Sequence, residues 1–87
     1  MAKGIQDERY RALITAMIDA RNRMGLSQAT FASRLRKRQQ FISKYETGER
    51  RLDVVEFIDV AVALGLDPFE TLRRLVKPSQ PDANMKK

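Results

Sequence analysis

Apolar residues recur with helical spacing in five segments of the chain, and no segment shows the sustained apolar–polar alternation of a strand. In the first segment the apolar stripe runs at intervals of three and four residues, through Tyr10, Leu13, Ile14, Met17 and Ile18. The predicted helices span residues 8–24, 28–35, 39–47, 54–64 and 68–77. The pattern therefore predicts an all-α fold, a compact bundle of five helices.

The last two helices carry the clearest start signals. Asp53 and Glu56 are spaced as a capping box. Asp67 is the expected N-cap of the last helix, and Pro68 is its expected first residue. We expect the inward face of helix 54–64 to comprise Val54, Phe57, Ile58, Ala61 and Leu64. We expect the inward face of helix 68–77 to comprise Phe69, Leu72, Leu75 and Val76.

The length of 87 residues fits one small domain. We expect this domain to span residues 8–77, after an N-terminal arm at 1–7 and before a flexible basic tail at 78–87. Because the chain has no cysteine to staple it, its stability must come from well-packed helices or from dimerisation.

The composition excludes several kinds of chemistry. Without cysteine or histidine there can be no disulfide, no thiolate or histidine catalysis and no zinc finger, so we expect no enzyme, no metal and no cofactor. No apolar run approaches the ~20 residues that span a bilayer, and the N-terminal residues do not resemble a signal peptide. We therefore expect a cytoplasmic protein that does not enter a membrane.

The charges are unevenly distributed along the chain. Lys and Arg number 17 against 11 Asp and Glu, for a net charge of +6. Residues 34–51 hold seven of the cations and two of the acids, whereas residues 52–70 hold five acids and no cation. A basic block beside an acidic one suggests one face for a polyanion and another turned away from it, although charge alone leaves a solvated charge run equally open.

Helices 28–35 and 39–47 are each about two turns long and are joined by a three-residue turn. Two such short helices are unstable alone, so longer neighbours must hold them, as in a helix-turn-helix. In that arrangement the second helix is presented to the major groove of DNA. Its outward residues are polar or basic, as base edges and phosphates require: Arg38, Gln39, Gln40, Ser43, Lys44 and Thr47.

At these positions the chain resembles the Cro/C1-type (XRE-like) helix-turn-helix regulators of bacteria and phages. The resemblance covers roughly residues 10–75, and the spacing of the family is kept without a gap from Leu26 to Gly65. It is carried by Leu26-Ser27-Gln28, by Phe31, Ala32 and Leu35, and by the runs 42–51 and 57–65. The resemblance implies a lambda-repressor-like DNA-binding domain.

The resemblance also implies residue roles. The residues expected to contact bases are Gln39, Gln40, Lys44 and Arg38, with glutamine suited to the N6 and N7 atoms of adenine. Those expected to contact phosphates are Gln28, Ser43, Arg50, Arg51 and Lys37. Lys44 could equally lie on a phosphate, and we expect Glu46 to have a structural role, capping a helix or pairing within the domain. The structural core of the motif would comprise Phe31, Ala32, Leu35, Ile42, Tyr45 and Gly48.

The turn between the two helices departs from the family pattern. Arg36 and Lys37 stand where many members have a glycine and an apolar residue. A left-handed conformation at Arg36 would cost ~1–2 kcal/mol relative to glycine, so we expect the turn to differ slightly. Phe41 either covers the place of the missing apolar residue or stays exposed to meet thymine methyl groups.

The sequence thus favours a sequence-specific regulator, a repressor that binds double-stranded DNA as a homodimer on a pseudo-palindrome. The candidate dimer surface comprises Val55, Val62, Leu66 and Leu72. Alternatives that keep the fold are the antitoxin of a toxin–antitoxin pair, with a toxin as protein partner, and a restriction–modification controller. An interaction domain that has lost DNA binding is disfavoured by the glutamine pair and the basic block.

Overall fold

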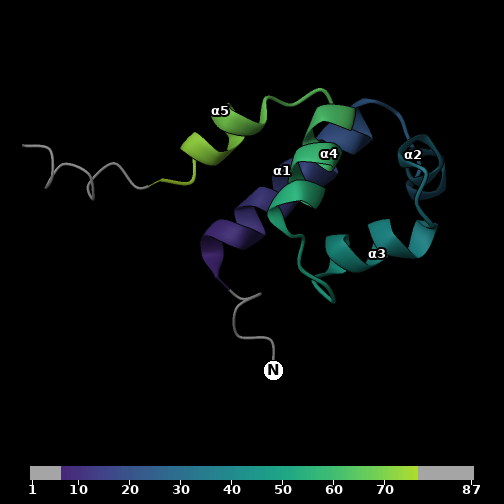
Figure 1. Cartoon of the computed structure of the whole chain (residues 1–87), viewed down its shortest axis with the longest axis horizontal. Helices are drawn as coiled ribbons and strands as arrows, with labels where there is room; N and C mark the ends of the chain where they lie inside the picture. Colours follow the sequence, from purple (N-terminus) through teal and green to yellow (C-terminus); the bar gives the residue numbers. More distant parts are fainter. Residues whose placement is uncertain (1–6, 77–87) are drawn as a thin grey trace, which may run out of the picture.

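The computed structural model describes residues 7–76 and within that range contains five α-helices and no strand. They are α1 (Glu8–Arg23), α2 (Gln28–Leu35), α3 (Gln39–Thr47), α4 (Val54–Ala63) and α5 (Pro68–Arg73). α2 and α3 lie at one end of the molecule and α5 at the other, with α1 and α4 between them (Figure 1). The predicted all-α bundle is confirmed. The expected tail, and the expected arm apart from Asp7, lie outside the described residues.

One apolar core joins the first four helices. Its fully buried large side chains come from α1, α2, α3 and α4: Met17, Phe31, Ile42, Tyr45 and Val60. Ala32 is also buried, which lets α2 and α3 pack closely, and Leu35 is half-buried at the edge. Because burying each large side chain stabilises the fold by ~1.5–3 kcal/mol, this core holds the two short helices in place. Between residues 7 and 76 no helix is both long and apolar enough to cross a bilayer.

The helix ends follow the sequence signals. Asp53 accepts from the backbone N–H of Glu56 at 2.7 Å, and the Glu56 side chain accepts from the N–H of Asp53 at 3.0 Å, which completes the capping box. Asp67 caps α5 by accepting from the backbone N–H groups of Phe69 and Glu70. α1 ends at Arg23, with Met24 as its C-cap, one residue earlier than predicted.

The inward faces predicted for α4 and α5 are partly wrong. Val54 is 71% exposed and Ile58 is also exposed, whereas Val60 is buried beside Phe57, Ala61 and Leu64. α4 is apolar on nearly every side, so periodicity alone does not determine which side faces the core.

In α5, Phe69 is 84% exposed and Leu72 is exposed. Beyond the end of α5, Val76 is exposed and Leu75 is half-buried. The helix ends at Arg73 instead of continuing towards Pro78. It packs chiefly on α4, and a helix with so few buried contacts has little to stabilise further turns.

Candidate nucleic-acid interface

The turn between α2 and α3 is left-handed at an arginine. Arg36 has φ 60° and ψ 40°, the one positive φ outside glycine within residues 7–76. The N–H of Lys37 donates to the Ala32 carbonyl at 2.9 Å, and the N–H of Arg36 donates to that of Ser33 at 3.1 Å. These bonds close α2 much as they would with a glycine in the turn. The chain therefore keeps the left-handed turn and accepts its conformational cost, and the slight difference that the sequence predicts is not found at Arg36.

We expect Arg36→Gly to stabilise the domain. Glycine removes the ~1–2 kcal/mol strain of the left-handed conformation, and its greater freedom in the unfolded chain returns part of that gain. The net expectation is a free energy of unfolding higher by up to about 1 kcal/mol, or a melting temperature higher by about 4 °C. Arg34→Gly, at an exposed position inside α2, should instead lower stability by about 1 kcal/mol. Thermal unfolding of the two variants tests the sign; a lower melting temperature for Arg36→Gly would contradict it.

The outward face of α3 gathers the residues expected to contact bases. Successive helical residues are 100° apart, so positions 39, 40, 43, 44 and 47 fall within an arc of about 140°. On that arc Gln39, Gln40 and Lys44 are exposed, whereas Ile42 and Tyr45 are buried on the opposite side. Arg38, the N-cap residue of α3, is exposed beside them. The helix thus presents two amides and one cation, that of Lys44, to solvent from one side, and Arg38 lies exposed at its N-terminal end.

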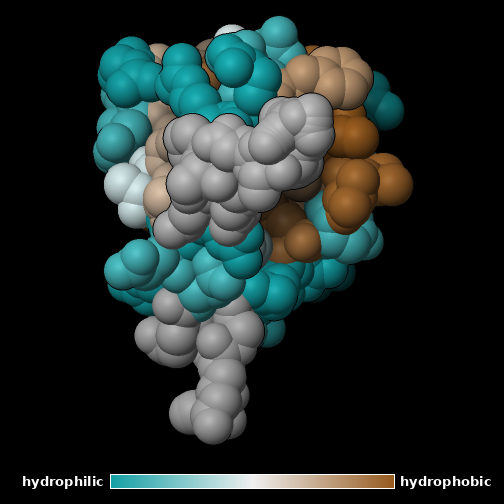
Figure 2. Space-filling model, turned by 90° about the vertical axis from the view of Figure 1, so that its left-hand side faces the viewer, coloured by the Kyte–Doolittle hydropathy of each residue, from teal (hydrophilic) through white to brown (hydrophobic). Residues whose placement is uncertain are grey.

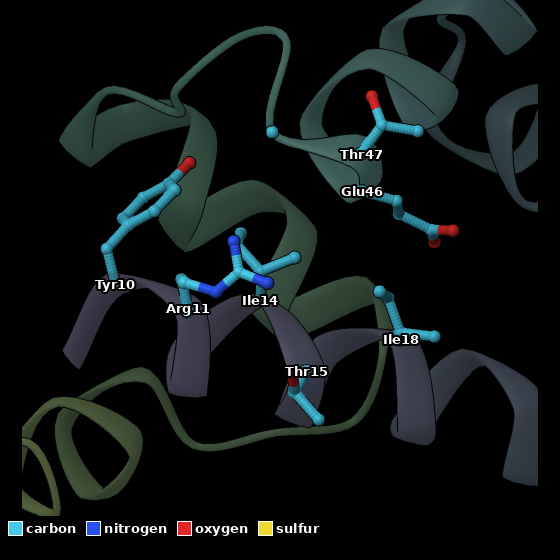
Figure 3. Close-up of a pocket in the computed structure, with 8 residues that line it drawn as sticks. Tyr10, Arg11, Ile14, Thr15, Ile18, Glu46 and Thr47 are labelled. Carbon is cyan, nitrogen blue, oxygen red and sulfur yellow. The ribbon is translucent and has the colours of Figure 1, made fainter. Parts of the chain in front are cut away.

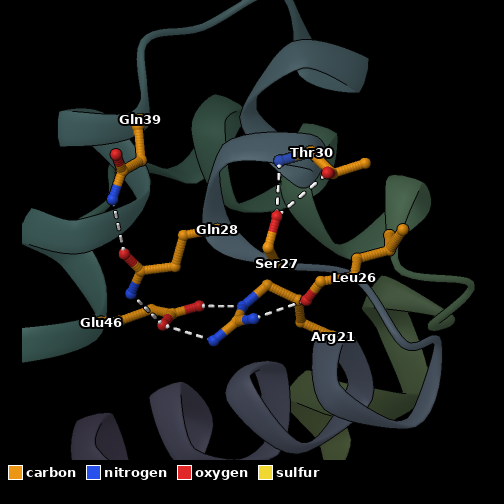
Figure 4. A network of polar contacts seen from close by, with 7 residues as sticks. All are labelled: Arg21, Leu26, Ser27, Gln28, Thr30, Gln39 and Glu46. Atoms are coloured by element: carbon orange, nitrogen blue, oxygen red, sulfur yellow. Dashed lines mark hydrogen bonds and ion pairs between the residues drawn. The ribbon is translucent and has the colours of Figure 1, made fainter.

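A chain of hydrogen bonds links this face to α1 (Figure 4). Arg21 donates from Nε to Glu46 Oε2 at 2.7 Å and from Nη2 to Glu46 Oε1 at 3.1 Å. Gln28 donates from Nε2 to Glu46 Oε1 at 2.9 Å, and Gln39 donates from Nε2 to Gln28 Oε1 at 3.0 Å. Glu46 therefore pairs within the domain, as expected, and Gln28 joins it to the first residue of α3.

Lys37 and Arg50 meet at the Phe41 ring rather than beside Gln39. The Lys37 Nζ and the Arg50 guanidinium carbon each lie 5.1 Å from the ring centroid, and the half-buried ring packs edge-on against Tyr45 at 5.6 Å. This arrangement supports packing, rather than thymine contact, as the role of Phe41.

Arg50 has a carboxylate partner at the start of α4. It donates to the two Glu56 oxygens at 2.9 and 2.6 Å. This guanidinium, together with the Asp53 N–H, lowers the pKa of Glu56 to about 2. The Arg50 guanidinium is therefore held by Glu56, which offsets its positive charge beside the end of α3.

The remaining expected phosphate contacts lie at two places. Gln28 is the first residue of α2, where the backbone N–H groups of a helix start favour an anion, and Ser43 is half-buried on α3. Arg51 is exposed, with its guanidinium 4.5 Å from the centroid of the Tyr10 ring of α1. The Tyr10 hydroxyl in turn accepts from the Leu52 N–H at 3.1 Å, which ties the segment after α3 to α1.

A hollow of about 190 Å³ lies between α1 and the end of α3 (Figure 3). Along α1 it is lined by Tyr10, Arg11 and Ile14, and from α3 by Glu46 and Thr47. Its charged groups are one arginine and one glutamate, and the part of the chain that is described holds no group of three or more acidic, Cys or His residues able to bind a metal. The candidate site is the exposed face of α3, which gathers the residues expected to contact bases.

Sequence reasoning missed Arg21. Its guanidinium also donates to the Leu26 carbonyl at 2.6 Å, so it braces the turn before α2 as well as α3. The signal was its position: Arg21 follows the buried Met17 by four residues, so it continues the inward stripe of α1. A cation on a core-facing position requires a partner, and Glu46 supplies it.

Comparison with known proteins bears on the same segment. A family model described as helix-turn-helix matches residues 17–71. Among solved structures, the chain is similar to an XRE-family like protein from Pseudomonas syringae pv. tomato str. DC3000, with a TM-score of 0.76 and 44% identity. That match covers 84% of this chain and 89% of the other. No curated protein matches the chain.

Proposed function

The chain belongs to the Cro/C1-type (XRE-like) helix-turn-helix family of DNA-binding regulators, and from that premise we propose that it is a sequence-specific transcriptional repressor. It binds double-stranded DNA in the cytoplasm by placing α3 in the major groove. The observation that carries the proposal is the outward face of α3, where Gln39, Gln40 and Lys44 lie exposed on one side of a helix whose other side is buried in the core.

Gln39 has the geometry of an adenine reader. Its bond to Gln28 uses one of the two N–H groups of its amide. The second N–H and the Oε1 atom form a coplanar donor and acceptor, the pattern that pairs with N7 and N6 of adenine. Gln40 and Arg38 read neighbouring bases, and Lys44 reads a guanine or lies on a phosphate. Gln28, Ser43, Lys37 and Arg51 contact phosphates that set the register.

A homodimer on a pseudo-palindrome fits the apolar surface of the protein. Figure 2 shows brown apolar atoms gathered on one side of the molecule. The exposed large apolar residues of α4 are Val54, Val55, Ile58 and Val62. Their positions fall within about 100° of the helix circumference, so they form one face. An antitoxin would bind its toxin through such a face, and a restriction–modification controller would dimerise through it, so the face alone does not separate these alternatives from a repressor.

Selection of bound sequences from a random DNA pool tests the proposal. We expect a motif of two inverted half-sites with centres ~10 bp apart or a multiple of that distance. Lys44→Ala should weaken binding to this motif. If Lys44 meets a phosphate, the slope of log affinity against log salt becomes shallower by about 1; if it reads guanine, the preference for that base falls instead.

Arg73→Ala is the matched control for Lys44→Ala, because Arg73 lies in α5, at the far end of the molecule from α3 (Figure 1). It should change the salt slope and the base preferences much less than Lys44→Ala does. A wild-type protein that selects no motif would contradict the proposed function.

A further inference from the structure

The chain of hydrogen bonds that runs from Arg21 through Glu46 and Gln28 to Gln39 has a fixed donor-to-acceptor direction. A carboxylate can only accept, and Glu46 Oε1 lies 2.9 Å from the Gln28 amide, so Gln28 must turn its NH2 group towards Glu46. The Gln28 oxygen then points to Gln39, so Gln39 must donate from its own NH2 group, and its Nε2 lies 3.0 Å from Gln28 Oε1. The orientation of the Gln39 amide is therefore set two hydrogen bonds away, by the buried carboxylate of Glu46.

The ion pair behind this chain of amides is itself fixed. The Arg21 side chain is 11% exposed and that of Glu46 is 6% exposed, so neither can change its partner for water without local opening. Arg21 holds both Glu46 oxygens and the Leu26 carbonyl, which leaves the carboxylate a single orientation (Figure 4). The last link of this chain, the bond from Gln39 to Gln28, lies on the exposed face of α3.

We propose that Arg21 and Glu46 determine which base Gln39 prefers, although both side chains are buried away from the outward face of α3. They are positioning residues: through Gln28 they decide which end of the Gln39 amide presents the donor and which the acceptor. The inference rests on the proposed function, since it requires that α3 reads bases. The recognition unit therefore includes α1, outside the two helices of the motif.

Glu46→Gln tests the direction of the relay. Each oxygen of Glu46 faces an Arg21 donor, Oε2 at 2.7 Å from Nε and Oε1 at 3.1 Å from Nη2. The new amide keeps its oxygen at the Oε2 position, because two donors at the shorter distance would repel more strongly. Its NH2 group then takes the Oε1 position and faces Gln28. Gln28 reverses its amide to accept this bond, and Gln39 reverses its own, so donor and acceptor exchange places at the groove.

Binding is measured to operators substituted at each position, which gives the base preference at every base pair. The base pair that Gln39 reads is the one whose preference Gln39→Ala abolishes, and the test compares the variants at that base pair. In folded Glu46→Gln, the preference for adenine at that base pair should fall about tenfold or more, as loss of a bidentate pair implies. Preferences at other base pairs should stay within about twofold of wild type, since each contact discriminates largely on its own.

Gln28→Met keeps the proposal testable if Glu46→Gln does not fold, because it leaves the ion pair of Arg21 and Glu46 intact. It should lower binding uniformly, through the lost phosphate contact, and in addition lower adenine preference at the Gln39 base pair. Glu56→Gln is the matched control: it neutralises another ion-paired glutamate, the partner of Arg50, and should leave preference at that base pair unchanged.

The outcomes separate the two proposals. A wild-type protein without base preference at any position would overturn the proposed function. A wild type with clear preferences, together with folded Glu46→Gln and Gln28→Met variants that keep the adenine preference, would overturn the relay and leave the function standing. Loss of preference at every base pair in Glu46→Gln would indicate a general distortion of α3 and would also contradict the relay.

Discussion

Arg21→Met lowers the free energy of unfolding by about 3–5 kcal/mol, the cost of leaving one partner of a buried ion pair uncompensated. The Glu46 carboxylate loses both hydrogen bonds from the guanidinium and keeps the one from Gln28. The Leu26 carbonyl loses its donor in the same step. A domain of this size has a total stability of only about 5–10 kcal/mol, so we expect a large unfolded fraction at 37 °C.

Urea unfolding followed by circular dichroism measures this loss. The exposed pair Arg73 and Glu70 is the matched comparison, and Arg73→Met should cost less than 1 kcal/mol because water already screens that pair. The double variant Arg21→Met with Glu46→Gln should regain part of the loss, because a neutral amide is cheaper to bury than a lone carboxylate. A loss below 1 kcal/mol for Arg21→Met would show that the pair contributes little to stability.

The parts of the fold that are local in sequence could be predicted. The capping box of Asp53 and Glu56 and the cap at Asp67 depend on residues within one turn, and the structure contains both. The start of α2 and the end of α3 also follow from the sequence, because Ser27 caps the first and Gly48 ends the second. The exposure of Gln39, Gln40 and Lys44 follows in turn, since the opposite side of α3 is apolar.

Features that depend on distant neighbours could not be predicted in this way. Arg21 and Glu46 are 25 residues apart, and no local pattern joins them. The conformation of Arg36 was open, because the strain of a left-handed arginine had to be weighed against the hydrogen bonds that close α2. The inward face of α4 was misassigned because its rotation is decided by the helices packed around it, and α5 is shorter than its apolar spacing suggested.

The exposed apolar face of α4 predicts that the protein forms a dimer through this helix. The sequence placed Val55 and Val62 on a dimer surface together with Leu66 and Leu72, and the structure shows Val55 66% and Val62 61% exposed, with Leu66 half-buried. Val54 and Ile58, expected in the core, lie on the same face of α4 instead. A continuous apolar face of this kind is costly for a monomer to expose, and a second subunit would cover it.

The double variant Val55→Glu and Val62→Glu should therefore be a folded monomer whose operator affinity is lower by more than about 100-fold. Two linked subunits bind their half-sites with an effective concentration that separate monomers lack, which accounts for a loss of ~10²–10⁴-fold. The fold should persist, because both side chains point away from the core. Sedimentation gives the oligomeric state and titration with the selected operator gives the affinity.

Ala12→Glu with Ala16→Glu controls for the added negative charge, because it places two acids at exposed positions of α1, one turn apart. It should leave the protein dimeric and lower operator affinity only modestly, through repulsion of the phosphates. A Val55→Glu and Val62→Glu variant that stays dimeric would place the dimer contact elsewhere. A wild type that is monomeric and occupies a single half-site would contradict the homodimer and favour a different protein, such as a toxin, as the partner of α4.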